Sequence, residues 1–386
     1  MTSSSRSFAL KLAAVPLLTL ALAGCGKDDG KDALEAAKAA YESSDNKKAE
    51  KLLARSLEEA PDNVDALVQQ ALVKLELGDI PAARAAVDAA AKLAPKDWDV
   101  RLLGARTAYH EKNYIRAAKA YGEIAEDRSL PPKVRADGWA GLGIVRMSAA
   151  AENRDHARLS FLRAIRLDRR NAAAWYHLGL VYRDGFGYGE AALEAFEIFV
   201  RLEQKADRRV QKVQRTFIPD LKDEIARRAT ERPGASKRDS AASAAAIRQA
   251  EAAVKAKKND TARGAYDRAL KADPLSYPAA LGLAQCWAKT AASKRFPHPQ
   301  LAALENYMVA CQLRPSAVST FLTAAELAVR TGQNATAVNL YSRAMAADYT
   351  NKTAIDGLIR ALRKAGRTSI ASAYQLYRDS LAEKVR

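Results

Sequence analysis

The histidines are the residues best suited to acid–base or metal chemistry in this sequence, and none of them has the partners that such chemistry needs. The chain contains no H-E-x-x-H pair for zinc, no Cys-x-x-Cys pair and no G-x-S-x-G turn that would present a nucleophilic serine. We therefore predict no catalytic residue, no metal site and no cofactor, and a protein that is not an enzyme. The four histidines are His110, His156, His177 and His298.

A glycine-rich run, Gly185-Phe-Gly187-Tyr-Gly189, has the look of a phosphate-binding loop. Such a loop follows a strand, opens a helix and supplies a lysine with a serine or threonine. This run instead lies between two helical patterns and lacks those partners. We predict a turn between two helices.

Two of the three cysteines, Cys286 and Cys311, lie late in the first and second helices of one predicted hairpin. Antiparallel helices would place them at opposite ends of that hairpin. At about 1.5 Å per residue over roughly two turns, their separation exceeds what a disulfide can span. We predict two separate buried thiols.

The third cysteine, Cys25, follows an apolar run close to the start of the chain. Residues 1–11 are basic, and the apolar run over residues 12–22 is too short to span a bilayer, which is the pattern of a secretory signal. The run ends in Leu22-Ala-Gly-Cys25, which resembles the bacterial lipobox. An ordinary signal peptide with a chance cysteine is the alternative.

The lipobox resemblance implies a signal peptide at residues 1–24, a lipid-modified Cys25 and a tether over residues 25–30. Two or more acyl chains anchor a protein stably where one would not. The residue after the cysteine is Gly26 rather than aspartate, which in this family implies the outer membrane, facing the periplasm.

The remainder of the sequence repeats with a period of 34 residues, the distance from Pro61 to Pro95. The chain resembles the tetratricopeptide-repeat family most clearly at Trp175-Tyr-His-Leu-Gly-Leu-Val-Tyr182, followed by Ala192-x3-Phe196. Second-helix signatures recur with an alanine and a larger residue four positions later. They are Ala83-x3-Val87, Ala117-x3-Tyr121, Ala262-x3-Tyr266, Ala303-x3-Tyr307 and Ala337-x3-Tyr341.

The repeat resemblance implies an all-α fold, a right-handed superhelical solenoid of about nine helical hairpins in two blocks, residues 31–202 and 243–386. Small residues let the helices approach closely, and each hairpin depends on its neighbours for a core. Between Pro274 and Pro315 the period grows by seven residues, which we place between two helices at residues 295–301. The first helices are expected to start near Gly30, Val64, Trp98, Ala136, Ala172, Ser243, Tyr277, Val318 and Lys352.

The pattern over residues 203–242 predicts a charged amphipathic helix followed by a linker. Apolar residues recur at three- and four-residue steps from Ala206 to Ile225, and Pro219 should kink the helix, break it or open a new one. Residues 231–240 are polar, with proline and glycine. We expect a movable hinge between the two blocks.

In this family the first helices line an inner face that binds extended peptides or partner helices, and the resemblance assigns that role to residues of both blocks. A mixture of aromatic residues and arginine suits protein recognition. The alternative is that these side chains are simply solvated. The candidates are Leu72, Arg106, Tyr109, His110, Tyr176, Leu180 and Arg183 in the first block, and Gln285, Lys289, Glu326, Arg330, Arg360, Arg363 and Lys364 in the second.

The formal charge of +17 would suit a nucleic-acid ligand, but an exported protein meets little DNA, so we expect none. Loss of the signal peptide lowers the charge to +15. The balance is −3 over residues 30–97, +6 over residues 201–238 and +5 over residues 352–386. We hypothesise that the anchored end stands off the anionic membrane, while the basic regions recruit an acidic partner or a cell-wall polymer.

Together these patterns favour a lipid-anchored scaffold or adaptor that binds proteins of a bacterial envelope assembly, of the pilus, gliding, secretion or outer-membrane biogenesis type. The alternative is a cell-wall accessory protein that binds peptidoglycan or regulates a peptidoglycan enzyme. No stretch outside the repeats is long enough for a catalytic domain.

Overall fold

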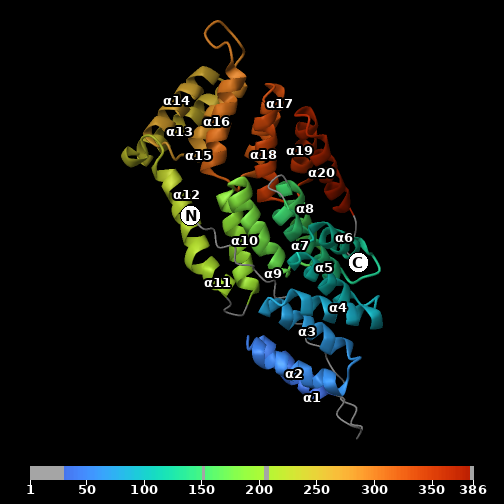
Figure 1. Cartoon of the computed structure of the whole chain (residues 1–386). Coiled ribbons are helices and arrows are strands. Elements are labelled where there is room, and N and C mark those ends of the chain that lie inside the picture. Colours follow the sequence, from blue (N-terminus) through green and yellow to red (C-terminus); the bar gives the residue numbers. More distant parts are fainter. Residues whose placement is uncertain (1–29, 150–152, 204–207, 383–386) are drawn as a thin grey trace, which may run out of the picture. The chain divides into compact units, whose positions relative to one another are not determined.

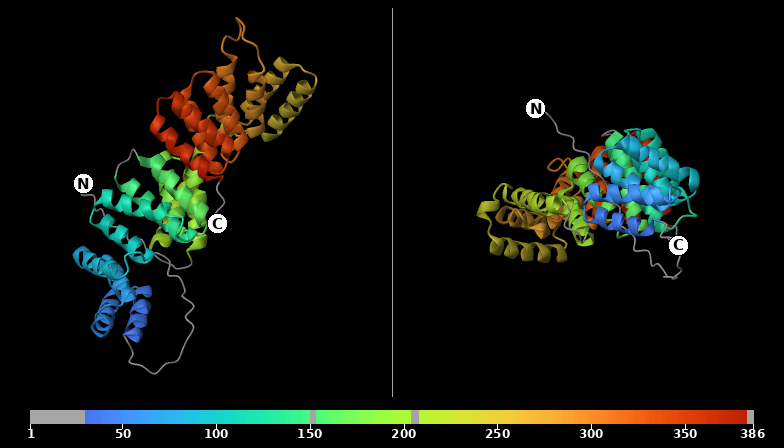
Figure 2. Two further views of the ribbon diagram at one scale, coloured as in Figure 1. Left: turned by 90° about the vertical axis from the view of Figure 1, so that its right-hand side faces the viewer. Right: turned by 60° about the horizontal axis from the view of Figure 1, so that its bottom comes forward.

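The structure is a computed structural model that describes residues 30–149, 153–203 and 208–382, and the regular structure in these ranges is helical. This confirms the predicted all-α repeat fold. The chain forms two compact units that meet in sequence between His177 and Leu178, and helices stack as antiparallel pairs within each unit (Figures 1 and 2). The predicted signal peptide, Cys25 and residues 25–29 of the predicted tether lie outside the described residues.

Unit 1 stacks helix pairs that begin close to the predicted residues. The last helix, α9, runs across the boundary into unit 2. The bounds are α1 Lys31–Glu42, α2 Asn46–Glu59, α3 Val64–Leu77, α4 Ile80–Leu93, α5 Trp98–His110, α6 Tyr114–Glu126, α7 Pro132–Ala149, α8 Arg154–Leu167 and α9 Ala172–Leu180.

Unit 2 starts with a π-helical turn, η2, and continues in helix pairs to the end of the described chain. The bounds are η2 Val181–Phe186, α10 Gly189–Leu202, α11 Arg208–Lys212, η3 Val213–Phe217, α12 Ile218–Thr230, η4 Ala235–Lys237, α13 Ser240–Lys255, α14 Asn259–Ala272, α15 Tyr277–Ala288, α16 Pro299–Leu313, α17 Val318–Arg330, α18 Asn334–Ala347, α19 Lys352–Lys364 and α20 Thr368–Ser380.

Within each unit, buried alanines recur at one position of the second helices, as the period predicted. Each of these alanines has no exposed surface, because the neighbouring helices approach too closely for a larger side chain. They are Ala49, Ala83, Ala117, Ala157, Ala192, Ala262, Ala303, Ala337 and Ala371.

Glycines in the first helices pack against aromatic rings of the second helices. A Cβ at Gly143 would overlap the ring of Phe161, and a Cβ at Gly179 would lie 2.6 Å from Cε1 of Phe196. These two rings belong to the same hairpin as the glycine. Three other glycines lie under a tyrosine of the preceding hairpin, and a Cβ there would overlap the ring. The pairs are Gly141 with Tyr121, Gly282 with Tyr266 and Gly357 with Tyr341.

In several hairpins the turn between the two helices has left-handed backbone at one position. Gly78 has φ +81°, and the residues one period away on either side, Ser44 and Lys112, have φ +65° and +61°. This conformation costs an L-residue on the order of 1 kcal/mol relative to glycine. Lys257 in unit 2 has the same strained backbone, with φ +58°.

Replacing Lys112 with glycine is therefore expected to raise the free energy of unfolding by about 0.5–1 kcal/mol. Urea unfolding followed by circular dichroism measures the change. Replacing Lys119, an exposed residue inside α6, with glycine serves as the control and should lower the free energy of unfolding by about 1 kcal/mol. A loss of stability in the Lys112 variant would contradict the strain argument.

The segments that interrupt the predicted repeat pattern form a loop, a glycine turn and a π-helical turn. The extra residues between α15 and α16 form a loop over residues 289–298 (Figure 1). The glycine-rich run is a turn, with Gly187 at φ +65° between η2 and α10. Pro219 lies in the first turn of α12, where its missing N–H is not needed, and the π-helical turn η3 precedes it.

Cys286 and Cys311 are both free and buried, which confirms the prediction of two separate thiols. Burial raises the pKa of the Cys311 thiol to about 12. Neither thiol is therefore a ready nucleophile at neutral pH.

No helix within the described residues is both long enough and apolar enough to cross a membrane. The predicted boundaries at residues 202 and 243, and the hinge between them, stay predictions. Within unit 2 the segment α11–η3–α12 packs on α10 through a buried apolar face of Val210, Val213, Phe217 and Leu221.

Candidate protein-binding faces

Most of the predicted partner-binding residues occupy two rows that recur once per first helix. The middle row lies eight residues after the expected helix start, and the end row lies four residues later, in the last turn. The middle row contains Leu72, Arg106, Leu180, Gln285, Glu326 and Arg360, and the end row contains His110, Lys289, Arg330 and Lys364. Tyr109, Tyr176, Arg183 and Arg363 flank these rows.

In unit 1 the structure buries two of the candidates. The side chains of Arg106 and Tyr176 are each only 4% exposed. Arg106 Nη2 lies 3.1 Å from Oε1 of Glu76, which is also largely buried. Nε and Nη1 of Arg106 are buried without a hydrogen-bond partner in the described part of the chain. Arg106 is therefore a structural cation inside unit 1, and the partly exposed Leu72 and His110 remain at the surface beside it.

The two aromatic candidates beside Arg106 are also held by neighbours. The hydroxyl of Tyr109 hydrogen-bonds Oγ of Ser148 at 3.0 Å, and its ring meets that of His110 edge-on at 5.6 Å. Burial, helped by the charge of Arg106, lowers the pKa of His110 to about 4. His110 is consequently neutral at physiological pH and can offer a partner a neutral hydrogen-bonding group rather than a charge.

One carboxyl group at the start of a first helix makes unit 1 sensitive to pH. Asp137 in α7 accepts a hydrogen bond from Nδ2 of Asn171 at 2.8 Å. Burial raises the pKa of Asp137 to about 7, and this outweighs the lowering by Asn171 and Lys133. The folded state thus holds its proton more tightly than the unfolded state, and stability falls as pH rises from about 4 to about 7.

Replacing Asp137 with asparagine keeps an oxygen acceptor for Asn171 and removes the buried charge. At pH 8 the variant is expected to be more stable than the wild type by up to about 4 kcal/mol, with the difference vanishing near pH 4. Urea unfolding at both pH values measures this. Glu123→Gln on the exposed surface of α6 is the control and should change the free energy of unfolding little at either pH. Equal stabilisation of the Asp137 variant at both pH values would contradict the assignment.

The candidates at the start of unit 2 are engaged within the unit. The Arg183 guanidinium lies 3.8 Å from the ring centroid of Phe217 and 2.6 Å from a carboxylate oxygen of Asp184. Leu180 is partly buried. Arg183 thus helps hold η3 against η2 and has little freedom to meet a partner.

From α15 to α19, by contrast, the predicted residues are exposed. Tyrosines of the second helices lie beneath this exposed face. Burial raises the pKa of Tyr307, and the charge of Arg330 lowers it in part. Burial also raises the pKa of Tyr341; the charge of Glu326 raises it further, whereas Arg360 lowers it. Glu326 of α17 and Arg360 of α19 therefore both lie near Tyr341 of α18. The exposed set is Gln285, Lys289, Glu326, Arg330, Arg360, Arg363 and Lys364.

Several residues of these faces were not predicted from the sequence. Glu251 and Lys255 of α13 lie at the same repeat positions as Gln285 and Lys289, so the period itself contained the signal. Glu76 lies at the position of His110 one repeat earlier. Tyr307 and Tyr341 were recognised only as packing residues, because the sequence pattern does not show how close their hydroxyls come to the exposed face.

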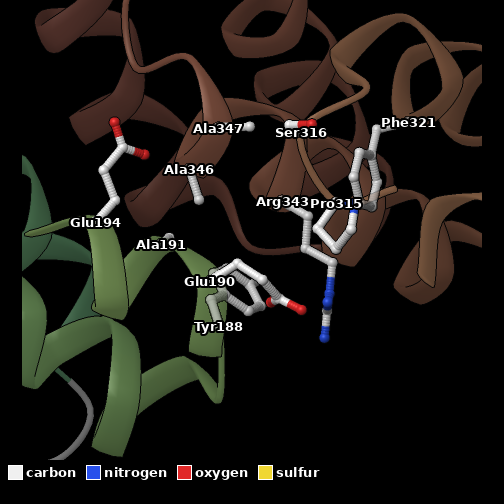
Figure 3. Close-up of a pocket in the computed structure, with 10 residues that line it drawn as sticks. All are labelled: Tyr188, Glu190, Ala191, Glu194, Pro315, Ser316, Phe321, Arg343, Ala346 and Ala347. Atoms are coloured by element: carbon white, nitrogen blue, oxygen red, sulfur yellow. The ribbon is translucent and has the colours of Figure 1, made fainter. Parts of the chain in front are cut away.

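Unit 2 also has a cavity where the start of α10 approaches the α16–α17 turn and the end of α18. Its floor includes the buried Tyr188 and Phe321. The Arg343 guanidinium lies 4.8 Å from the ring centroid of Tyr188. In Figure 3 the side chain of Arg343 extends toward Tyr188 and Glu190, whereas Glu194 points away from them. The polar groups do not converge on one point, so we assign this cavity no ligand.

The described residues contain no group of three or more histidine, cysteine, aspartate or glutamate side chains that could hold a metal ion. Several helices form the exposed face from α15 to α19, and this face carries charges of both signs. Such a surface suits contact with another macromolecule.

Family comparisons identify tetratricopeptide repeats in both units. Family models described as tetratricopeptide repeat match residues 40–107 and residues 247–298. Neither match indicates a catalytic family, and repeats of this class are protein-interaction modules. Among curated proteins no sequence matches the chain.

Solved structures with similar architecture include other repeat proteins. PilF of Pseudomonas aeruginosa is 14% identical, with a TM-score of 0.39, over 68% of this chain and 98% of that chain. MamA of Desulfovibrio magneticus RS-1 is 19% identical, with a TM-score of 0.35, over 47% of this chain and 98% of that chain. The Cut9–Hcn1 assembly of the APC/C is 15% identical, with a TM-score of 0.37, over 93% of this chain and 80% of that chain. These similarities carry no information about partners.

Proposed function

We propose that the protein is a lipid-anchored, non-enzymatic scaffold that holds proteins of a bacterial envelope assembly together. The observation that carries the proposal is the exposed first-helix face from α15 to α19, where arginines and lysines are exposed together with Glu326. Tyrosines lie beneath this face. Arginine is among the side chains that contribute most at protein interfaces.

The shape of this face favours a polypeptide partner over a small molecule. Its residues come from successive helices of the stack rather than from one enclosed pocket. A small ligand would need a concave site that buries most of its surface. An extended segment or a helix can instead contact several repeats at once.

A combined variant of Gln285, Arg330 and Arg360, each changed to alanine, tests this role. Crosslinking in intact cells followed by affinity purification should recover specific envelope proteins with the wild type and lose them with the variant. The control is Lys47→Ala with Lys51→Ala, two exposed residues of α2. Recovery of the same proteins by both variants would refute the assigned face.

The lipid anchor at Cys25 and the location on the outer membrane facing the periplasm are part of the proposal. They are supported by the sequence pattern that precedes Cys25. Replacing Cys25 with serine should abolish incorporation of labelled palmitate and release the protein from membranes. A variant that still fractionates with membranes would contradict anchoring through this cysteine.

A cell-wall accessory role is the second candidate, and the basic face of α11 and η3 favours it. Arg208 and Arg215 are exposed there, opposite the buried apolar face. An anionic wall polymer would bind such a surface in a salt-sensitive way. Sedimentation of the purified protein with isolated wall sacculi, with no other protein present, would favour this function. No sedimentation at low salt would exclude it.

A further inference from the structure

We propose that unit 2 binds an extended acidic segment of a partner protein along a ladder of four cations. The cation ladder consists of Lys255, Lys289, Arg330 and Lys364, which end the first helices α13, α15, α17 and α19 or directly follow them. The inference rests on the proposed function, because it specifies the partner of that exposed face.

The four cations share one repeat position. They are separated by 34, 41 and 34 residues, so the register survives the seven-residue insertion between α15 and α16. All four side chains are exposed. Consecutive first helices therefore each present one positive charge at the same end of the stack in unit 2.

Unit 1 carries no such ladder at the same position. Its first helices have Glu76, His110 and Ser148 there. A cation near a helix C-terminus is favoured by the helix dipole, but that preference would apply equally to both units. The contrast between the units shows that helix stability alone does not account for the ladder.

Within the described residues, none of the four ladder side chains forms an ion pair. The ion pairs found in this part of the described chain join other residues, such as Arg263 with Asp260 and Arg378 with Asp356. The middle row, one turn away, carries Glu251 and Glu326, with Arg360 as its cation. These two carboxylates repel an acidic segment and so confine it to the end row.

The spacing of the ladder specifies the form of the segment. The first helices α13 and α15 contact each other, as do α17 and α19, and packed helices lie about 8–10 Å apart. A polyproline II chain has three residues per turn and rises about 3.1 Å per residue, so every third side chain recurs after roughly 9 Å on one side. A segment with an acidic residue at every third position therefore matches the cation pair of α13 with α15 and the pair of α17 with α19. Arginine at position 330 can bind a carboxylate through two parallel hydrogen bonds.

A fluorescent peptide of four Glu-Pro-Ser repeats tests this inference with the purified full-length protein. Fluorescence anisotropy should show binding at low salt that weakens steeply as salt is raised. The matching Gln-Pro-Ser peptide should not bind. Lys289→Glu combined with Arg330→Glu should weaken binding of the acidic peptide at least tenfold, and the milder Lys289→Gln with Arg330→Gln should cause a smaller loss.

The matched control changes the same charge on another surface of unit 2. Lys237→Glu with Lys352→Glu alters exposed residues of η4 and of the first turn of α19, at the opposite end of that helix from Lys364, and leaves the ladder intact. Its affinity for the peptide should stay within about twofold of the wild type. Circular dichroism checks that each variant is folded.

Three outcomes would overturn the inference: no binding of the acidic peptide to the wild type, equal losses in ladder and control variants, or binding to vesicles containing anionic lipid without binding to the peptide. If the peptide fails but partner capture in cells still depends on Gln285, Arg330 and Arg360, the acidic partner is wrong and the scaffold function stands.

Discussion

Replacing Glu76 with alanine is expected to destabilise unit 1 by about 3 kcal/mol. The side chains of Arg106 and Glu76 are only 4% and 13% exposed, so neither charge is well hydrated. Two of the Arg106 nitrogens already lack a hydrogen-bond partner within the described residues. Removing the carboxylate leaves a buried guanidinium beside the neutral side chain of Tyr41, with no negative charge to offset its desolvation. Urea unfolding followed by circular dichroism measures the loss.

An exposed ion pair provides the control for this prediction. Arg55 and Glu59 of α2 are 3.3 Å apart, with side chains 72% and 39% exposed. Glu59→Ala should therefore change the free energy of unfolding by no more than about 0.5 kcal/mol. The double variant Glu76→Leu with Arg106→Met should recover most of the stability, because apolar groups replace both charges. A Glu76→Ala protein as stable as the wild type would contradict the burial argument.

Replacing Gly357 with alanine is expected to lower the free energy of unfolding by about 2 kcal/mol. The new Cβ would overlap the ring of Tyr341, which is only 2% exposed and cannot move aside. Overpacking of this kind costs about 1–3 kcal/mol and outweighs the gain of up to about 1 kcal/mol from better helix propensity. Hydrogen exchange of the α18 and α19 amides locates the loss within the stack.

A glycine with free space around it gives the opposite sign. A Cβ placed at Gly122 in α6 would have no heavy atom within 4 Å, apart from its chain neighbours and the nearby backbone of its own helix. Gly122→Ala should therefore stabilise the protein by up to about 1 kcal/mol. Adding Tyr341→Leu to Gly357→Ala should return part of the lost stability, because the ring is gone. Equal effects of the two alanine substitutions would show that the glycine–tyrosine contact does not determine stability.

Much of the fold follows from the period of the sequence. Helices that begin at Val64, Trp98, Tyr277, Val318 and Lys352 start at the residues expected. The reason is physical, since the buried alanine of each second helix and the ring beside it require the same spacing in every repeat. The period also separates the free thiols of Cys286 and Cys311.

The depth of individual side chains could not be predicted in the same way. Arg106 and Gln285 occupy the same position in their repeats, but Arg106 is buried beside Glu76 while Gln285 is exposed. Burial depends on neighbours contributed by other repeats, which the position within one repeat does not specify. The π-helical turns η2 and η3 likewise depend on packing around Tyr182 and Phe217 rather than on a local signal.

Site-specific photo-crosslinking in living cells is the most direct measurement of the central claim. A photoreactive phenylalanine analogue at Gln285 would stand on the exposed face of unit 2, and one at Ile115, which is 87% exposed on the second helix α6, would stand away from the first-helix faces. We predict a discrete protein adduct from position 285 and none from position 115. The absence of any protein adduct at position 285, or the same adducts at both positions, would contradict the account.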